Sequence, residues 1–125
     1  MGNTIARTKI LKIISLAKHP VNYSGIKDLV GNSFSRVTIY RMLIRLEKES
    51  LIYRFPDLKG DFRYSICSGS EETTPNNHFQ CTVCDTVYKL EREPIEVSIP
   101  DDYLVHTVQV LTAGICPECK IFKEN

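Results

Sequence analysis

The chain has 125 residues, of which 42% are hydrophobic and 25% are charged, a balance typical of a globular protein with one modest core or two small ones. Lys and Arg interrupt every apolar run well before the ~20 residues that a membrane helix needs, and the basic N-terminus lacks the apolar stretch of a signal peptide. We therefore expect a soluble cytoplasmic protein with no membrane partner.

The net charge of +1 conceals two halves of opposite sign. Residues 1–66 contain twelve Lys and Arg against five Asp and Glu, a net +7, whereas residues 67–125 contain four against ten, a net −6. This polarity predicts that the first half binds a polyanion and that the second half has another task. The expected organisation is a first domain over 1–67, a polar, turn-rich linker over 68–77 and a second domain over 78–125.

Three amphipathic helices are predicted in the basic half. Residues 4–18 carry Ile at helical spacing and stop before a His-Pro pair, and residues 24–30 form a shorter helix that a glycine ends. Residues 35–49 form the third helix, with Ser35 as its N-cap. Because a tight Gly-containing turn joins the last two, the pattern predicts a helix-turn-helix unit.

The third helix has an apolar face and a basic face. The apolar face is expected to pack, and Met42 and Ile44 are expected to widen it. The spacing assigns Ile39, Leu43 and Leu46 to the packed face, and Thr38, Arg41, Arg45 and Lys48 to the other. Alone, such a helix would be interpreted as a core helix with a solvated charged stripe, so its surroundings decide its role.

Two strand-like segments follow the third helix. Residues 51–55 and 62–66 flank a turn that contains Gly60 and together predict a hairpin with basic residues. Three helices and a hairpin indicate a winged helix, whose third helix normally enters the major groove of DNA while the wing follows the backbone. The expected DNA contacts are Ser33, Ser35, Arg36, Thr38, Tyr40, Arg41, Arg45, Lys59 and Arg63. For Tyr40, packing against the neighbouring helices is an equal alternative.

The acidic half contains two Cys-x-x-Cys pairs, Cys81 with Cys84 and Cys116 with Cys119. Four thiolates presented by two tight turns suit a tetrahedral zinc ion, which would stabilise a small domain with few large apolar residues. The site is expected to be structural, because four thiolates leave no position for water. Two disulfides, disfavoured in the cytosol, and a rubredoxin-like iron site are the alternatives.

The residues between the two pairs must return the chain to the first pair. We expect two antiparallel strands, residues 86–90 and 103–112, to do this. The fifth cysteine, Cys67, has no partner nearby in the sequence and is interpreted as a buried or wing-end thiol, with redox sensing as the alternative.

These motifs together resemble the ferric uptake regulator family of bacterial metal- and peroxide-responsive repressors. Residues 35–43 match its recognition-helix signature, residues 46–52 match the helix end that runs into the wing, and His78-x-x-Cys81-x-x-Cys84 and Gly114-x-Cys116-x-x-Cys119 match its zinc knuckles. The resemblance implies an α+β protein, with an N-terminal winged helix and a small, mostly antiparallel, zinc-stabilised dimerisation domain. It also implies a homodimer on a pseudo-palindromic operator, and repression controlled by a second, regulatory divalent metal.

The chain departs from the family pattern where the regulatory metal is expected. Only His78 remains of the His-rich run before the first cysteine pair, and Tyr23 stands where a sensory His is expected. The Pro-containing residues 91–102 can hold no long helix. His78, Glu96 and His106 are the candidate ligands of a second metal, with a structural role for both histidines as the alternative. We therefore expect a short family member with a depleted regulatory site.

The leading hypothesis is a homodimeric transcriptional regulator, a repressor, that contains structural zinc and reads double-stranded DNA. It would need no small-molecule substrate. The alternative is a winged-helix and zinc-ribbon module that docks on the transcription machinery without reading sequence. An enzyme is not expected, because no base–nucleophile pair is visible and the paired cysteines have a structural use.

Overall fold

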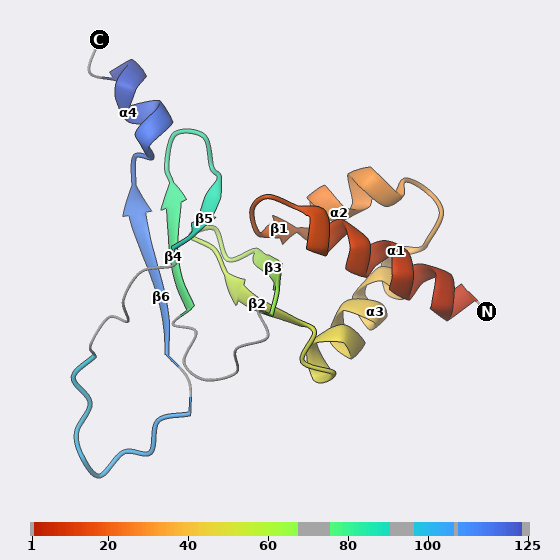
Figure 1. Cartoon of the computed structure of the whole chain (residues 1–125), viewed down its shortest axis with the longest axis horizontal. Coiled ribbons are helices and arrows are strands. Elements are labelled where there is room, and N and C mark those ends of the chain that lie inside the picture. Colours follow the sequence, from red (N-terminus) through yellow and green to blue (C-terminus); the bar gives the residue numbers. More distant parts are fainter. Residues whose placement is uncertain (1, 68–75, 91–96, 107, 124–125) are drawn as a thin grey trace. The chain divides into compact units, whose positions relative to one another are not determined.

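A computed structural model of the chain describes residues 2–67, 76–90, 97–106 and 108–123. Its contacts form two compact units, Met1–Cys67 and Ser68–Asn125 (Figure 1). In the part of the chain that is described, no helix combines the length and the apolar character that crossing a membrane requires.

The first unit begins with three helices, α1 (Gly2–Leu16), α2 (Tyr23–Val30) and α3 (Arg36–Lys48). Side chains cap the last two: Asn22 Oδ1 accepts from the Gly25 amide at 2.9 Å, and Ser35 Oγ accepts from the Thr38 amide at 3.2 Å. The three predicted helices are thus confirmed to within two residues at each end.

A small antiparallel sheet completes this unit. Strands β2 (Ile52–Pro56) and β3 (Phe62–Ile66) form the predicted hairpin, with Arg54 opposite Tyr64. A two-residue strand, β1 (Val21–Asn22), pairs with β3 on its other side, which gives the order β1-β3-β2. The sequence did not predict β1, because two residues are too few to show alternation.

One apolar core joins the helices and the wing. Its buried members are Ala6, Ile10, Ile14, Ile26, Val30, Ile39, Met42, Leu43, Leu46, Ile52 and Tyr64. Ile44 is the exception to the predicted packed face, because 52% of it is exposed. Two residues of helix turn a side chain by about 200°, so Ile44 and the buried Leu46 point in opposite directions. The expectation that Ile44 widens the packed face was therefore wrong.

Two ion pairs fix the C-terminal end of α3. Arg7 Nη2 lies 2.7 Å from Glu49 Oε1 and connects this end to α1. Arg54 Nε lies 2.9 Å from Glu47 Oε2 and connects it to β2. Both pairs are partly exposed, so they orient the helix more than they stabilise it.

The second unit is a three-stranded mixed sheet followed by a short helix (Figure 1). Strand β4 (Asn76–Cys81) lies in the centre, antiparallel to β5 (Val87–Lys89) and parallel to β6 (Gln109–Gly114). Helix α4 (Pro117–Lys123), which was not predicted, follows β6.

Strand β4 changes the expected topology. The segments 86–90 and 103–112 were expected to be two antiparallel strands. They do run in opposite directions, but β4 lies between them and pairs with both, and the second strand starts only at Gln109. β4 begins at Asn76, inside the expected linker 68–77, of which residues 68–75 lie outside the described residues. Of the segment expected to hold no long helix, residues 97–102 are described and contain none.

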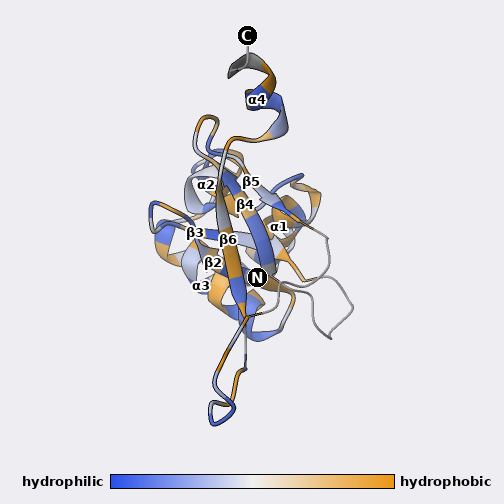
Figure 2. Ribbon diagram, turned by 90° about the vertical axis from the view of Figure 1, so that its left-hand side faces the viewer, coloured by the Kyte–Doolittle hydropathy of each residue, from blue (hydrophilic) through white to orange (hydrophobic). Residues whose placement is uncertain are grey.

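The central strand is polar in sequence and buried in the structure. Figure 2 shows hydrophilic residues along β4 beside the more hydrophobic β6. Asn77, His78 and Gln80 are at most 6% exposed, and Gln80 Nε2 donates to Asp85 Oδ1 at 3.0 Å. Polar residues rarely occupy such positions, so composition gave no strand signal here.

Candidate metal centre and nucleic-acid interface

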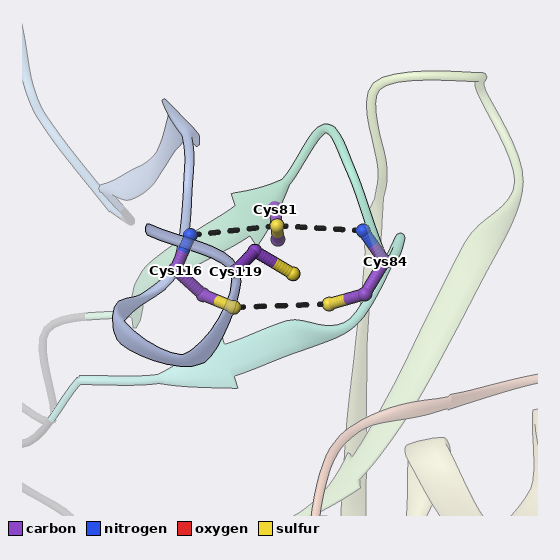
Figure 3. Close-up of side chains that lie close together, drawn as sticks. All are labelled: Cys81, Cys84, Cys116 and Cys119. Carbon is purple, nitrogen blue, oxygen red and sulfur yellow. Dashed lines mark hydrogen bonds between the residues drawn. The ribbon is translucent and has the colours of Figure 1, made fainter. Parts of the chain in front are cut away.

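The parallel pairing of β4 with β6 brings the two cysteine pairs together. Cys81 is the last residue of β4 and stands opposite Gly114, the last residue of β6. The Thr82 amide donates to the Gly114 carbonyl at 2.8 Å, which ties the first cysteine turn to the end of β6. Cys116 follows two residues later, so both turns meet at the same edge of the sheet (Figure 3).

Gly114 lies in close packing at this edge. A Cβ added to it would lie 3.2 Å from Cζ of the Phe79 ring, closer than ordinary van der Waals contact. Phe79 belongs to β4, so the absence of a side chain at Gly114 lets the two strands approach each other. Close packing against Phe79 therefore accounts for the glycine in the second zinc-knuckle motif.

The four cysteine sulfurs converge on one point. All four lie within 4.8 Å of one another, and Cys84 Sγ lies 3.8 Å from Cys116 Sγ. In a tetrahedral site with Zn–S bonds of about 2.3 Å, neighbouring sulfurs lie about 3.8 Å apart. Among the described residues, this is the only group of three or more potential metal ligands. The predicted Cys81, Cys84, Cys116 and Cys119 set therefore fits structural zinc.

Hydrogen bonds orient the sulfurs. Cys81 Sγ accepts from the amides of Val83, Cys84 and Cys116 at 3.3 to 3.4 Å. The Cys84 thiol donates to Thr86 Oγ1 at 3.4 Å, a bond that reverses when the thiolate forms. Backbone amides and a hydroxyl are typical outer partners of zinc-bound thiolates, because they hold the ligand in position.

These contacts also set the acidity of the thiols. Burial raises the pKa of Cys81, but its three amide donors outweigh burial and lower the pKa to about 6. The hydrogen bond that the Tyr88 hydroxyl donates to the Cys116 sulfur is the main cause of the lowered pKa of Cys116. The hydrogen bond with Cys116, together with burial, raises the pKa of Cys119 to about 12. A metal ion that binds here displaces the remaining protons.

The geometry of the four sulfurs affects the two alternatives to structural zinc, namely two disulfides and an iron site, differently. All four cysteines are free thiols, and they face one common centre rather than forming two separate pairs. This arrangement disfavours the two-disulfide alternative. Four thiolates also accept iron, so the donor set alone does not exclude a rubredoxin-like site.

The second-metal candidates are not assembled by the described residues. His78 lies in the middle of β4, is 1% exposed, and stands between Lys89 and Leu111 of the flanking strands. His106 is exposed, and Glu96 lies outside the described residues. Neither histidine belongs to a group of three or more potential ligands in the described ranges. The regulatory site expected from His78, Glu96 and His106 therefore stays a prediction.

Tyr23 has a packing role in place of a metal-binding one. Its ring stacks on that of Tyr40, with centroids 4.7 Å apart and an angle of 7° between the rings. The Arg36 guanidinium lies 5.2 Å from the centre of Tyr23 and 5.7 Å from that of Tyr40. Such stacking and cation–π contacts connect the start of α2 to the first turns of α3. The packing alternative for Tyr40 is thus realised in the structure.

The other expected DNA contacts differ in availability. Ser33, Arg41, Arg45 and Lys59 are exposed, and Thr38 is half-buried. The Ser35 hydroxyl is engaged as the N-cap of α3. Arg63 is only 8% exposed, and its Nε lies 2.8 Å from Asp57 Oδ2. This geometry argues against Arg63 as a phosphate contact, because the guanidinium is engaged inside the wing.

Sequence reasoning did not single out three side chains of these sites. Asp57 holds Arg63 in the wing, and Thr86 and Tyr88 bond to the cysteine sulfurs. The turn sequence Pro-Asp-x-x-Gly could have indicated an aspartate that bonds to its own turn. The alternation along 86–88 could have placed both hydroxyls on the cysteine side, but only if the position of β5 were known.

The chain was compared with protein-family profiles, with curated proteins and with solved structures. The profile of the ferric uptake regulator family matches residues 1–115. No curated protein matches the chain in sequence. A zinc uptake regulator in complex with zinc and DNA is similar in structure, with a TM-score of 0.72 and 17% identity, over 96% of this chain and 84% of that one.

Two further solved structures are similar over nearly the whole chain. The Helicobacter pylori ferric uptake regulator has a TM-score of 0.65 and 18% identity, over 93% of this chain and 80% of its own. The Vibrio cholerae ferric uptake regulator has a TM-score of 0.60 and 15% identity, over 90% and 89%. At such identities the structures establish the fold, and the sequence profile establishes the relationship. The chain belongs to the ferric uptake regulator family.

Proposed function

We propose that this protein is a homodimeric, zinc-stabilised transcriptional repressor that binds a pseudo-palindromic DNA operator in the cytoplasm. The observation that carries the proposal is the exposure of Arg41 and Arg45 on α3, on the side of the helix away from its buried residues. In a winged helix this is the helix that normally enters the major groove. A reaction is not part of the proposal, because the four clustered cysteines act as structural ligands.

The charges of the first unit support DNA as the partner. Its excess of Lys and Arg suits the phosphate backbone, and the Ser35 cap and the Arg36–Tyr23–Tyr40 contacts fix the start of α3. The ion pairs of Glu47 and Glu49 fix its other end. Base recognition requires a basic helix that is held rigidly, because the orientation of the helix must be fixed before its side chains can contact specific bases.

Homodimer formation is supported by an exposed apolar surface in the second unit. Six apolar side chains between 97 and 108 are at least 40% exposed, namely Val97, Ile99, Tyr103, Leu104, Val105 and Val108. Within the described residues, β6 also pairs on one side only, with β4. A second copy would cover both features, and two-fold symmetry would match a pseudo-palindromic operator.

We expect sedimentation equilibrium to give about twice the chain mass of 14.3 kDa. Replacing both Leu104 and Val105 with glutamate should shift the protein to monomers, because charges would be buried against the second copy. Leu16→Glu on α1 is the matched control, since Leu16 is 74% exposed but lies in the other unit. A double variant that remains dimeric would contradict this surface assignment.

The DNA-binding proposal is tested by its salt dependence. Fluorescence anisotropy with labelled duplexes should show affinity falling by roughly 10³-fold or more between 50 and 200 mM salt, if about six phosphates are neutralised. Arg45→Ala should lower the slope by about one if Arg45 contacts a phosphate. Affinity that does not change with salt would contradict the proposal.

Sequence preference separates the repressor from the interaction module. Selection from a random duplex library should enrich a pseudo-palindromic sequence if the protein reads bases. Binding that depends on salt but enriches no sequence would favour the module that docks on the transcription machinery.

A further inference from the structure

The face of α3 that points away from the core combines basic and branched apolar side chains. Val37, Arg41, Ile44 and Lys48 follow one another at i, i+4, i+7 and i+11. At about 100° per residue, these four side chains lie within roughly 60° of one another around the helix. Val37 is 56% exposed and Ile44 is 52% exposed, whereas the opposite side of the helix is buried. We call these four residues the outer row of α3.

The two apolar members of the outer row contribute little to the fold. Neither belongs to the buried core or to the side chains packed against it. Branched side chains are also weaker helix formers than the Lys, Arg or Glu that usually occupy exposed positions. A binding role accounts for both residues, because each gains contacts only when another molecule covers the helix.

We propose that Val37 and Ile44 contact the 5-methyl groups of thymine in the major groove and so favour operators with thymine at these positions. This inference rests on the proposed DNA-binding function. In the major groove, thymine is the one base that presents a methyl group, and apolar side chains recognise it. The occupant is duplex DNA, because Arg41 and Lys48 alternate with the two apolar residues and complement the phosphates on either side.

The spacing of the outer row defines what the operator must contain. Ile44 lies seven positions after Val37, a rise of about 10.5 Å along the helix axis. Base pairs stack about 3.4 Å apart, so a helix inclined in the groove brings the two side chains to methyl groups at most about three base pairs apart. Each half-site should therefore contain two thymines within this separation, on either strand.

The test removes the methyl groups and nothing else. A duplex selected from a random library is synthesised twice, once with thymine and once with uracil at every thymine position. We expect binding about fourfold weaker for each contacted methyl group, and therefore about 16-fold weaker for each half-site, which loses two of them. In the double variant Val37→Ser, Ile44→Ser, the thymine and uracil duplexes should bind equally. Serine has a helix propensity close to those of Val and Ile, so α3 is retained.

Helix α1 supplies the matched control. It carries a similar row of Ile5, Lys9, Lys12 and Leu16, in which Ile5 is 62% exposed and Leu16 is 74% exposed. The double variant Ile5→Ser, Leu16→Ser should keep the full preference for thymine. Circular dichroism of both double variants verifies that they are folded.

The outcomes separate this inference from the proposed function. Equal binding of both duplexes by the unmodified protein would overturn the role of thymine methyl groups and leave DNA binding in place. A persistent preference in the Val37→Ser, Ile44→Ser variant would overturn the assignment to these two residues. Failure of any duplex to be enriched or bound would overturn the proposed function, and the inference with it.

Discussion

Replacing Cys116 with serine is expected to unfold the second unit. Cys116 is fully buried where β6 leads into α4, and its sulfur accepts from the Tyr88 hydroxyl. The buried apolar residues described in this unit are only Cys81, Val87 and Cys116, so two of the three belong to the candidate metal centre. A structural zinc can contribute ~10 kcal/mol or more to folding, which exceeds what such a small core supplies.

Metal content and thermal unfolding measure this effect together. The unmodified protein should contain one zinc per chain and lose it, together with the second unit, when a strong chelator is added. Cys116→Ser should contain less than one zinc and show an early loss of β-sheet signal, while the helices of the first unit unfold later. The unmodified protein is also expected to unfold in two transitions, because it consists of two separate compact units.

Cys67→Ser is the matched control for cysteine chemistry. Cys67 is partly buried in the first unit and does not belong to the four-sulfur group. This variant should keep both its zinc and its two unfolding transitions. A Cys116→Ser protein with a full zinc content and unchanged unfolding would show that the cluster does not hold the metal. Iron in place of zinc would keep the structural role and favour the rubredoxin-like alternative.

The elements with local signals were predictable from the sequence. Helical periodicity and caps such as Ser35 depend on residues three or four positions apart, so they can be read without knowing the fold. The Cys-x-x-Cys spacing is local as well, because each pair forms within one turn. These signals account for the helices, the wing and the four cysteines of the candidate metal centre.

The remaining features depend on contacts between distant segments. Strand β4 is polar, and its central position follows from partners β5 and β6, the latter about thirty residues away along the chain. No periodicity predicts a parallel pairing of that kind. Ile44 was misplaced because periodicity gives the width of an apolar face only roughly, and the packing of α3 decided where the face ends.

The role of Arg63 was missed for a related reason. As a charged residue on a predicted wing it was expected to face DNA, but the hairpin register places it beside Asp57 across the turn. Charged side chains lie on the surface unless a specific partner pairs with them inside the protein, and the sequence did not reveal that Asp57 is such a partner. The same pair makes the wing sensitive to a single substitution.

Asp57→Ala is expected to destabilise the wing by about 3 kcal/mol, because it removes the buried carboxylate that pairs with Arg63. Asp57 is 6% exposed, and its carboxylate accepts from Arg63 Nε at 2.8 Å and from the amides of Lys59 and Asp61 at 2.9 and 3.1 Å. These bonds close the turn between β2 and β3. Hydrogen exchange of the wing amides, measured by NMR, should therefore become faster than in the unmodified protein.

The pH dependence of exchange tests the charge itself. Burial raises the pKa of Asp57, but Arg63 and the two amides outweigh it, so the pKa lies below its ordinary value of 3.8. A carboxyl whose pKa is lowered by folding stabilises the protein above its ordinary pKa, and this stabilisation is lost as the pH falls through the lowered value. The protection factors of the wing amides, which are their exchange rates corrected for the intrinsic pH dependence of exchange, should thus fall below about pH 4 in the unmodified protein. Asp57→Ala should lack this step.

Asp61→Ala is the control within the same turn, because Asp61 is exposed and contributes its backbone rather than its side chain to the bonds of Asp57. Asp57→Asn keeps an oxygen for the two amides but removes the charge, so its exchange should lie between those of Asp61→Ala and Asp57→Ala. If exchange in Asp57→Ala matched that in Asp61→Ala at neutral pH, the buried ion pair would not hold the wing. Arg63 would then return to the set of DNA-contact candidates, since its ion pair with Asp57 would not be what holds the wing.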